Sequence, residues 1–358
     1  MTDSWERLSL YESRDLLSRF YQNRHGGQLS AGKSYEIIAH LAQGRGFFAS
    51  ARQSSELARP LLLYYGVYAL SRGLILFLDT KLRECSLPPS HGIEAEGWQH
   101  ALARGIDQLS NLPLKITGGT FGVLSKATSN TDRCRVHGLP IYATPYHLLV
   151  RGGTTTVATP TIISLKMVLE RVPDLSTIFT TTFGSSPKCF QAMLFIHSED
   201  VQTDVHILET ELGFPDVDDM RSAFGLSADV SLQPSDTSWE YEVNNSIYRR
   251  SIFYRINHSS KSELLAKLPP IKSDREGNTY VVELMPNSLD LSSLSLLYLI
   301  AYSMGMLARY YPSKWLSLLN SSKGDFAFPL MKAATTVVED RFPQLVLQEL
   351  EGSMPSPV

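Results

Sequence analysis

Two long apolar segments near the ends of the chain decide its fold: PLLLYYGVYALSRGLILFL at residues 60–78 and LDLSSLSLLYLIAYSMGMLA at residues 289–308. The first segment carries only one charged residue, Arg72, and the second only Asp290. Each is close to the roughly 20 residues that a helix needs to cross a bilayer, but an arginine in mid-segment is costly in lipid. A helix that is apolar on all sides is more often enclosed by other helices. We therefore predict two buried core helices that pack on each other, with membrane helices as the alternative.

The rest of the sequence predicts helices near both ends of the chain and a middle region that contains β-strands. Apolar residues recur at helical spacing, which predicts helices at 5–24, 33–52, 54–84, 94–110, 161–171, 289–310, 312–320 and 327–351, the last with a break at Pro343. Gly and Pro are frequent over residues 112–160, which predicts short strands or loops there. Residues 190–285 are rich in β-branched and aromatic residues separated by turn formers, which predicts a small, mostly antiparallel sheet.

The sequence therefore predicts an α+β fold, with a mainly helical body formed by the N- and C-terminal helices and an inserted β-containing middle. We expect an N-terminal helical region at 1–130, a mixed region with mostly antiparallel strands at 131–288, and a C-terminal helical region at 289–358 that packs on the N-terminal helices. Charged residues are scarce over 136–198. The middle is therefore expected to pack on the helical core or to be covered by a partner.

The composition excludes several classes of protein. The 358 residues include 33 Lys+Arg and 36 Asp+Glu, a net charge of −3, which does not fit a strongly basic nucleic-acid coat protein. Hydrophobic residues make up 43%, enough for a full core, and collagen-like and disulfide-scaffold classes are excluded. Cys85, Cys134 and Cys189 are widely spaced, so we expect no metal site and no disulfide framework. Because residues 1–17 show no secretory signal, we expect a protein of the reducing cytoplasm.

Residues 27–34, GQLSAGKS, match the phosphate-loop pattern G-x-x-x-x-G-K-[ST]. In such a loop the backbone cradles phosphates, the lysine reaches the β- and γ-phosphates and the final serine binds magnesium, so ATP with magnesium is the only cofactor that the sequence suggests. The residues that would bind the nucleotide are Gly27, Gly32, Lys33 and Ser34. A strand should precede the loop, but RFYQNRH resembles the end of a helix. The alternative is a loop in which Ser30 or Ser34 caps the next helix.

Residues 247–261, IYRRSIFYRINHSSK, interleave basic and aromatic side chains. Arginines that bind phosphates and aromatic rings that stack on bases are how proteins hold single strands. Arg249, Arg250 and Arg255 are therefore candidate nucleic-acid-binding residues. The same pattern is ordinary for a β-strand with one solvated face, and both interpretations stay open.

Four stretches of the chain carry a resemblance to a known family. They are ARPLLLYYGVYALSRGLI at 58–75, SHG at 90–92, GGTFGVLSKAT at 118–128 and SMGMLARYYPSKWLSLLNSSKGDFAFPLMKAA at 303–334. Together they resemble the YaaC-like family of bacterial proteins over most of the chain. The resemblance implies a soluble bacterial protein and transfers no reaction.

The segment RPLLLYYGVYALSRG at 59–73 is also similar to HEPN-type helical domains, many of which are ribonucleases in toxin and phage-defence systems. The Arg-x4–6-His motif of those domains is not found on the predicted C-terminal helices, where the similarity would need it. The resemblance therefore implies a HEPN-like helical body that binds RNA rather than cutting it.

We expect a pocket shared by the two helical ends of the chain. Its candidate catalytic residues are Arg72, His91 and Arg309, and its candidate ligand-binding residues are Arg59, Tyr64, Tyr65, Tyr310 and Trp315. Arginine can stabilise charge on a phosphoryl group and histidine can move a proton. The alternative is a structural role, in which Arg72 and Arg309 satisfy buried carbonyls or a carboxylate such as Asp79 or Asp290.

The sequence predicts an interaction protein that binds RNA or a nucleotide through a HEPN-like helical body, in a stress or phage-defence role. Three alternatives stay open: a ribonuclease effector, a phosphate-loop enzyme, and a scaffold for a partner protein. We expect no association with membranes, and an oligomer is compatible with the sequence.

Overall fold

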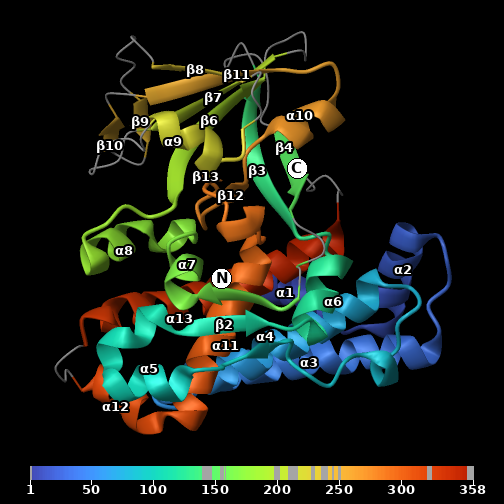
Figure 1. Ribbon diagram of the computed structural model, residues 1–358. Coiled ribbons are helices and arrows are strands. Elements are labelled where there is room, and N and C mark those ends of the chain that lie inside the picture. Colours follow the sequence, from blue (N-terminus) through green and yellow to red (C-terminus); the bar gives the residue numbers. More distant parts are fainter. Residues whose placement is uncertain are drawn as a thin grey trace. The chain divides into compact units, whose positions relative to one another are not determined.

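The computed structural model of the chain (Figure 1) describes all residues except 1, 139–146, 154–156, 158, 197–201, 209–216, 227–229, 235–240, 244–245, 249–250, 321–324 and 353–358. The chain divides into two compact units. A helical unit comprises Met1–Asn130, Thr154–Leu169 and Ser293–Val358, and a sheet unit comprises Thr131–Gly153 and Glu170–Ser292. The predicted α+β class with a helical body is confirmed.

The helical unit contains both ends of the chain. Its helices are α1 (Thr2–Leu10), α2 (Arg14–His25), α3 (Ala31–Gln53), α4 (Arg59–Leu78), α5 (Trp98–Arg104), α6 (Gly119–Ala127), α7 (Leu165–Leu169), α11 (Ser293–Tyr310), α12 (Pro312–Leu319) and α13 (Phe328–Glu351). Short 3₁₀ helices lie at Glu84–Ser86, Ile106–Asn111 and Asp325–Ala327. A small antiparallel sheet has the strand order β1 (Ile93–Glu94), β2 (Pro113–Ile116), β5 (Thr161–Ser164).

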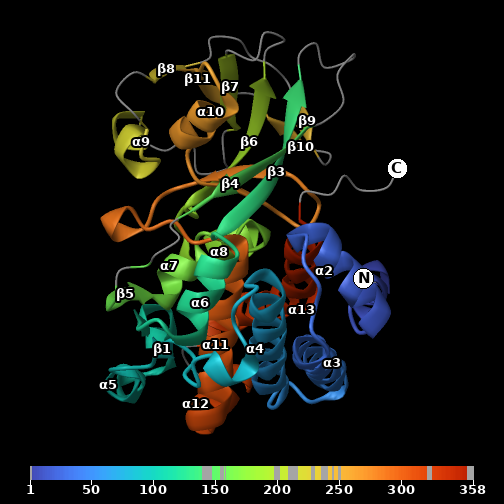
Figure 2. The same cartoon turned by 90° about the vertical axis from the view of Figure 1, so that its right-hand side faces the viewer.

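Helix α4 is the centre of the helical unit. It packs against α3, α11 and α13, and these helices lie side by side in Figure 2. Among the helices that the structure describes, only α4 is long and apolar enough to cross a bilayer, and 67% of that stretch is buried inside the protein. As predicted for both apolar segments, α4 and α11 are buried core helices that contact each other.

Glycine lets α11 approach α4 closely. A Cβ atom on Gly305 of α11 would lie 2.7 Å from the Cβ of Tyr64 on α4, closer than real Cβ contacts come. Gly66, further along α4, similarly faces the ring of Phe48 on α3. Because these positions carry no side chain, the three helices pack at distances that an alanine would prevent.

Several predictions for the helical unit differ from the structure. The predicted helix at 5–24 is two helices, because α1 ends at Leu10 and α2 begins at Arg14. α6 lies within 112–160, where the sequence predicts short strands or loops.

α13 continues through Pro343, where a break was expected, because Phe342, Pro343 and Leu345 are buried and this packing offsets the hydrogen bond that proline cannot donate. The predicted helix at 161–171 begins as strand β5, whose β-branched residues pair with β2. The predicted helix at 94–110 is shortened to α5 and a 3₁₀ helix, since Gly97 and Gly105 adopt positive φ angles at its two ends.

The sheet unit is built around one main sheet, and two of its helices pack on one face of that sheet. Its main sheet has the strand order β12 (Ile271–Ser273), β13 (Thr279–Val282), β6 (Cys189–Ile196), β7 (Gln202–Leu208), β11 (Ser251–Asn257), β8 (Ser231–Pro234), and neighbouring strands along this order are antiparallel. β3 (Thr131–Gly138) pairs antiparallel with β4 (His147–Gly152) and parallel with β6. A separate hairpin joins β9 (Tyr241–Val243) to β10 (Ser246–Tyr248). The helices are α8 (Ser176–Phe183), α9 (Val217–Ala223) and α10 (Lys261–Lys267), with 3₁₀ turns at Pro173–Leu175 and Pro286–Ser288.

The core of the sheet unit lies between the sheet and two of these helices. Met220 of α9 and Leu264 of α10 pack on apolar side chains that alternate along the strands, such as Leu194, Val205 and Tyr254. This alternation is the period-2 pattern of strands with one buried face.

A buried ionic network ties together segments of the sheet unit that lie close to its ends. Lys272, which is only 1% exposed, lies 2.9 Å from Asp132 and 3.6 Å from Asp290 and donates to the carbonyl of Leu291 at 2.5 Å. Arg151 lies 2.5 Å from the second oxygen of Asp290. Two acids and two bases therefore neutralise each other where their desolvation is costly, and removing one partner leaves buried charge.

The first prediction concerns this network. We expect Lys272→Met to lower the free energy of unfolding by about 3–5 kcal/mol, because the largely buried carboxylates of Asp132 and Asp290 lose their contacts with the Lys272 ammonium. Urea denaturation followed by circular dichroism measures the loss. Lys267→Met is the control, because Lys267 forms an i,i+4 pair with Glu263 and such a pair contributes less than about 1 kcal/mol. Equal, small losses for both variants would contradict a stabilising network.

A second prediction tests the contact between α4 and α11. Gly305→Ala is expected to destabilise the protein by about 1–3 kcal/mol, since the new methyl group collides with Tyr64. Gly46→Ala is the matched control, because it lies inside α3 with no atom within 4 Å of the new Cβ and should gain roughly 0.5–1 kcal/mol from helix propensity. Thermal and urea unfolding measure both, and a stabilising Gly305→Ala would refute the close approach.

Candidate functional site

Two glycine-containing turns of the helical unit lock His91 in place. The amides of Thr120 and Phe121, at the start of α6, donate to the carbonyls of Ser90 at 3.0 Å and of His91 at 3.1 Å. Gly92 has a φ of +87°, and a Cβ there would overlap the carbonyl of Gly118. The close contact between the Gly92 and Gly118 backbones therefore requires glycine at position 92. The Ser90 and His91 carbonyls accept hydrogen bonds from amides that the start of a helix leaves unpaired. The SHG and GGTFG stretches thus form a clasp that holds the backbone of His91.

The imidazole of His91 lies among tyrosine rings from α4 and α11, which we call the tyrosine cage. Its ring centroid lies 5.1 Å from Tyr68, 5.3 Å from Tyr64 and 6.2 Å from Tyr302. The hydroxyl of Tyr298 donates to the His91 carbonyl at 3.2 Å. Each helix contributes two tyrosines four residues apart, so the cage depends on the packing of α11 against α4.

Burial in the cage favours the neutral forms of His91, Tyr64, Tyr298 and Tyr302. Burial lowers the pKa of His91 below its ordinary value, and the positive charge of Arg309 lowers it further. Burial also raises the pKa of Tyr302 to about 12 and raises those of Tyr64 and Tyr298. The Nδ1 atom of His91 is buried and has no hydrogen-bond partner among the described residues. A neutral imidazole with an unoccupied nitrogen is able to accept or donate a proton.

Arg72 lies at one end of the cage. Its guanidinium lies 5.5 Å from the centroid of the Tyr68 ring, and Nη1 donates to the Tyr68 hydroxyl at 3.3 Å and to the carbonyl of Pro88 at 3.1 Å. Arg72 therefore does part of what the structural alternative predicted, since it satisfies a carbonyl. It also keeps a cation beside the cage.

Arg309 lies on the exposed surface at the end of α11. Nη1 donates to the hydroxyl of Tyr65 at 2.7 Å, and the guanidinium lies 5.0 Å from the ring of Tyr310, which is 60% exposed. The ring of Phe47 on α3 stacks on Tyr65 with centroids 5.6 Å apart and an angle of 30° between the planes. Aromatic faces and a cation therefore meet on one exposed surface.

Residues 65, 68 and 72 form one stripe along α4, at spacings i, i+3 and i+7. We call Tyr65, Tyr68 and Arg72, together with Arg309 and His91, the α4 stripe. The structure thus brings together the predicted residues Tyr64, Tyr65, Arg72, His91, Arg309 and Tyr310. Phe47, Tyr68, Tyr298 and Tyr302 were not predicted, although the four-residue spacing of Tyr64 to Tyr68 and of Tyr298 to Tyr302 was visible in the sequence.

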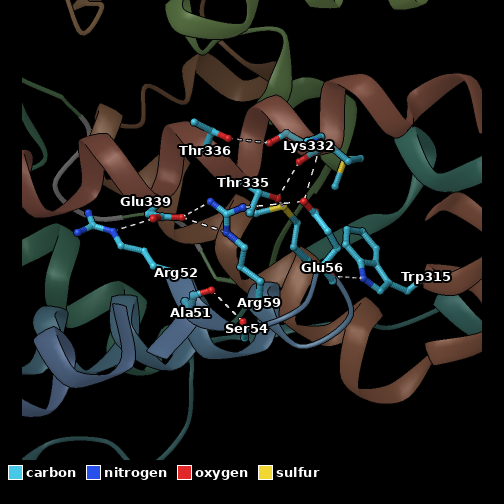
Figure 3. Close-up of polar contacts among 12 residues, drawn as sticks. Ala51, Arg52, Ser54, Glu56, Arg59, Trp315, Lys332, Thr335, Thr336 and Glu339 are labelled. Atoms are coloured by element: carbon cyan, nitrogen blue, oxygen red, sulfur yellow. Dashed lines mark hydrogen bonds and ion pairs between the residues drawn. The ribbon is translucent and has the colours of Figure 1, made fainter. Parts of the chain in front are cut away.

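Arg59 and Trp315, also predicted for this pocket, are engaged elsewhere in the helical unit (Figure 3). Arg59 pairs with Glu339 of α13, and Nε of Arg52 contacts the other carboxylate oxygen at 2.8 Å. The indole of Trp315 donates to the carbonyl of Glu56 at 3.0 Å. Glu339 is 6% exposed, so it needs these cations for its own burial. Arg59 and Trp315 therefore bind the protein itself in this structure, and no contact among the described residues joins them to the tyrosine cage.

The phosphate-loop pattern does not have the structure that nucleotide binding requires. Helix α2, not a strand, precedes Gly27, and Gly26 ends that helix in the left-handed conformation. Ser30 caps α3 by accepting from the amide of Lys33 at 3.3 Å, and the Lys33 ammonium donates to the Asp79 carbonyl at 2.6 Å. The interpretation of these residues as a helix cap is confirmed.

The lysine and serine of that pattern are buried in packing. Lys33 is 5% and Ser34 1% exposed, whereas Gly27 and Gly32 are exposed and the guanidinium of Arg83 lies close to Gly32. Burial lowers the pKa of Lys33 from its ordinary value. A lysine that ties the end of α4 to the start of α3 is not presented to a phosphate, so the structure offers no support for Gly27, Gly32, Lys33 and Ser34 as a nucleotide site.

The candidate nucleic-acid strand has one solvated face. Ile252 and Ile256 of β11 are buried, whereas Arg255 points outward and binds Asp204 through two hydrogen bonds of 2.7 and 2.8 Å. Arg255 is thus paired within the protein. Arg249 and Arg250 lie outside the described residues.

Within the described part of the chain, no three His, Cys, Asp or Glu side chains are grouped so that they could hold a metal ion. The three cysteines are free thiols, with Cys85 exposed and Cys134 and Cys189 buried. Burial raises the pKa of Cys134 to about 12 and also raises that of Cys189, so these two thiols are unreactive near neutral pH.

Comparison with known proteins identifies one family. A family model described as YaaC-like Protein matches residues 9–350. No curated protein and no solved structure matches the chain.

The third prediction concerns pH. Burial lowers the pKa values of His25, His40 and His91 below 6.5, so the unfolded chain takes up protons there that the folded chain does not. Stability should therefore be full above pH 6.5 and fall as the pH drops toward 5. Glu36 and Glu263, whose pKa values are also lowered, titrate below 4.5 and do not contribute in this window.

Urea denaturation at pH 7.5, 6.5 and 5.5 measures this dependence. His91→Phe keeps an aromatic ring in the cage but removes one titrating group, so its stability should fall less steeply than that of the wild type. His100→Phe, at an exposed position of α5, should leave the slope unchanged. Identical slopes for His91→Phe and the wild type would contradict a depressed pKa at His91.

Proposed function

The chain belongs to the YaaC-like family, and we propose that it is a single-stranded RNA-binding protein that uses the α4 stripe. The observation that carries the proposal is a surface cluster in which the Arg309 guanidinium contacts both Tyr65 and Tyr310. The ring of Phe47 stacks on Tyr65. Proteins that hold single strands combine cations for phosphates with aromatic side chains for bases. Arginine is suited to this role because its planar guanidinium binds phosphate oxygens in pairs and also stacks on rings.

The length and charge of the stripe favour a short RNA segment. Tyr65 and Arg72 are seven residues apart on α4, which at 1.5 Å per residue is about 10 Å. The whole chain carries a net charge of −3, so attraction for RNA comes from a local cluster rather than from the overall field. We therefore propose that a few exposed nucleotides of a loop or an end bind along the stripe.

The cellular setting is part of the proposal. The similarity of α4 to HEPN-type helices supports a HEPN-like helical body acting in a stress or phage-defence role. Three free thiols support a reducing cytoplasm. A partner protein bound at the same aromatic surface is the scaffold alternative.

A specific observation also favours a second candidate function, a ribonuclease. The backbone of His91 is fixed, its pKa is lowered and its Nδ1 is unoccupied, while Arg72 binds Tyr68 of the cage and the charge of Arg309 acts on His91. A neutral histidine next to cations is the arrangement that moves a proton while phosphoryl charge develops. This histidine is not part of a HEPN-type Arg-x4–6-His motif, because His91 lies on a turn before β1 and not on a C-terminal helix.

The fourth prediction tests RNA binding. Arg309→Ala should weaken binding of a fluorescent 12-nucleotide single-stranded RNA about tenfold or more and reduce the slope of log Kd against log salt by about 1, because one phosphate contact is lost. Fluorescence anisotropy measures both quantities. Arg45→Ala is the control, because Arg45 is a half-exposed arginine of α3 that binds Glu12 and projects about 200° around the helix from Phe47.

Two outcomes would refute the proposal. The first is a wild-type protein that is folded but does not bind RNA, and the second is equal loss of affinity in Arg309→Ala and Arg45→Ala. The same binding reactions, resolved on a denaturing gel, distinguish the second candidate. Cleavage that disappears in His91→Phe would favour the ribonuclease, and intact RNA at high protein concentration would exclude it.

A further inference from the structure

His91 is surrounded by aromatic and positive groups and lacks a negative one. α4 faces it with Tyr64 and Tyr68 and, behind Tyr68, the cation of Arg72. α11 faces it with Tyr302 and, through the backbone carbonyl, Tyr298, and the charge of Arg309 acts on it from the same helix. α6 approaches it through the Phe121 amide, which donates to the His91 carbonyl.

One acid acts on the cage through Tyr302, and none in the described part of the chain is a resolved influence on the imidazole. Glu94 of β1 influences Tyr302 electrostatically, and among the described residues no carboxylate lies within ion-pair distance of His91. The contrast is His40 of α3, whose Nε2 lies 3.3 Å from Glu84. In the unliganded protein, a proton on His91 would therefore meet only like charge and low polarity.

We propose that binding of RNA at the α4 stripe is coupled to protonation of His91, with a phosphate group of the RNA supplying the negative charge that the cage lacks. This inference rests on the proposed RNA-binding function and names its regulation. The balance is simple: one proton passes from a buffer acid to the unoccupied Nδ1 of His91, and the new positive charge is neutralised by one phosphodiester charge.

The cage is suited to hold the protonated form once the phosphate is present. A tyrosine face within about 6 Å of a cation attracts it. The ring centroids of Tyr68 and Tyr64 lie 5.1 and 5.3 Å from the imidazole, with their planes steeply inclined to it, and that of Tyr302 lies at 6.2 Å. In the proposed complex Arg309, which opposes the proton in the free protein, is neutralised by a neighbouring phosphate of the same strand. RNA therefore removes the repulsion and adds an attraction in one step.

Thermodynamic linkage makes the coupling reciprocal. If RNA favours the proton, then the proton favours RNA by the same factor. RNA affinity is therefore expected to rise as the pH falls below 7, by up to about tenfold per pH unit where one full proton is taken up. The protein would bind RNA more tightly in an acidified cell.

The experiment measures Kd for the same 12-nucleotide RNA at pH 7.5, 6.5 and 5.5 at constant ionic strength. Calorimetry at pH 6.5 in two buffers of different ionisation enthalpy counts the protons taken up on binding. The expected wild-type results are tighter binding at lower pH and uptake of up to one proton. His91→Phe should lose this proton uptake and most of the pH dependence, whatever its affinity at pH 7.5.

His100→Phe is the matched control, because it removes an exposed histidine of α5 and should keep the wild-type pH dependence. Binding with no proton uptake, or with the same pH dependence in His91→Phe as in the wild type, would overturn the coupling and leave the RNA-binding function intact. A folded wild-type protein that binds no RNA between pH 5.5 and 7.5 would overturn the binding function and the coupling together.

Discussion

The close packing of α11 on α4 is the interaction on which the helical unit depends. α4 is apolar on nearly all sides and cannot bury itself, so it needs helices from elsewhere in the chain. The C-terminal helices α11 and α13 supply them, and α11 comes close enough only because Gly305 leaves room for Tyr64. This one constraint closes the two chain ends into a single body.

The same contact builds the candidate site. Tyrosines four residues apart on each helix meet across the interface and enclose His91, while the clasp at Gly92 fixes the backbone of that histidine. Structure and proposed function are therefore not separable here. The buried rings stabilise the packing of the two helices, and their exposed neighbours Arg309 and Tyr310 form the surface that RNA would meet.

The spacing of hydrophobic residues predicted much of the fold. Where a prediction from sequence failed, the neighbouring elements and their packing explain the failure. The buried helices at 60–78 and 289–308 and the one-sided strand carrying Arg255 follow directly from hydrophobic spacing. The phosphate-loop pattern shows the limit, because the same letters serve a helix cap once a helix precedes them and Lys33 turns to the Asp79 carbonyl. Likewise α13 continues through Pro343, because buried residues on both sides of the proline pack against the rest of the helical unit.

The sequence by itself determined the α+β class, the family and the need for the two apolar helices to be enclosed, because these depend on composition and on spacing along the chain. Only the tertiary structure decided which arginines are available. Arg59 is bound to Glu339 and Arg255 to Asp204, whereas Arg309 stays on the surface beside Tyr310. The physical reason is that a charge's role depends on the partner that folding places beside it, and partners such as Arg59 and Glu339 are hundreds of residues apart in the sequence.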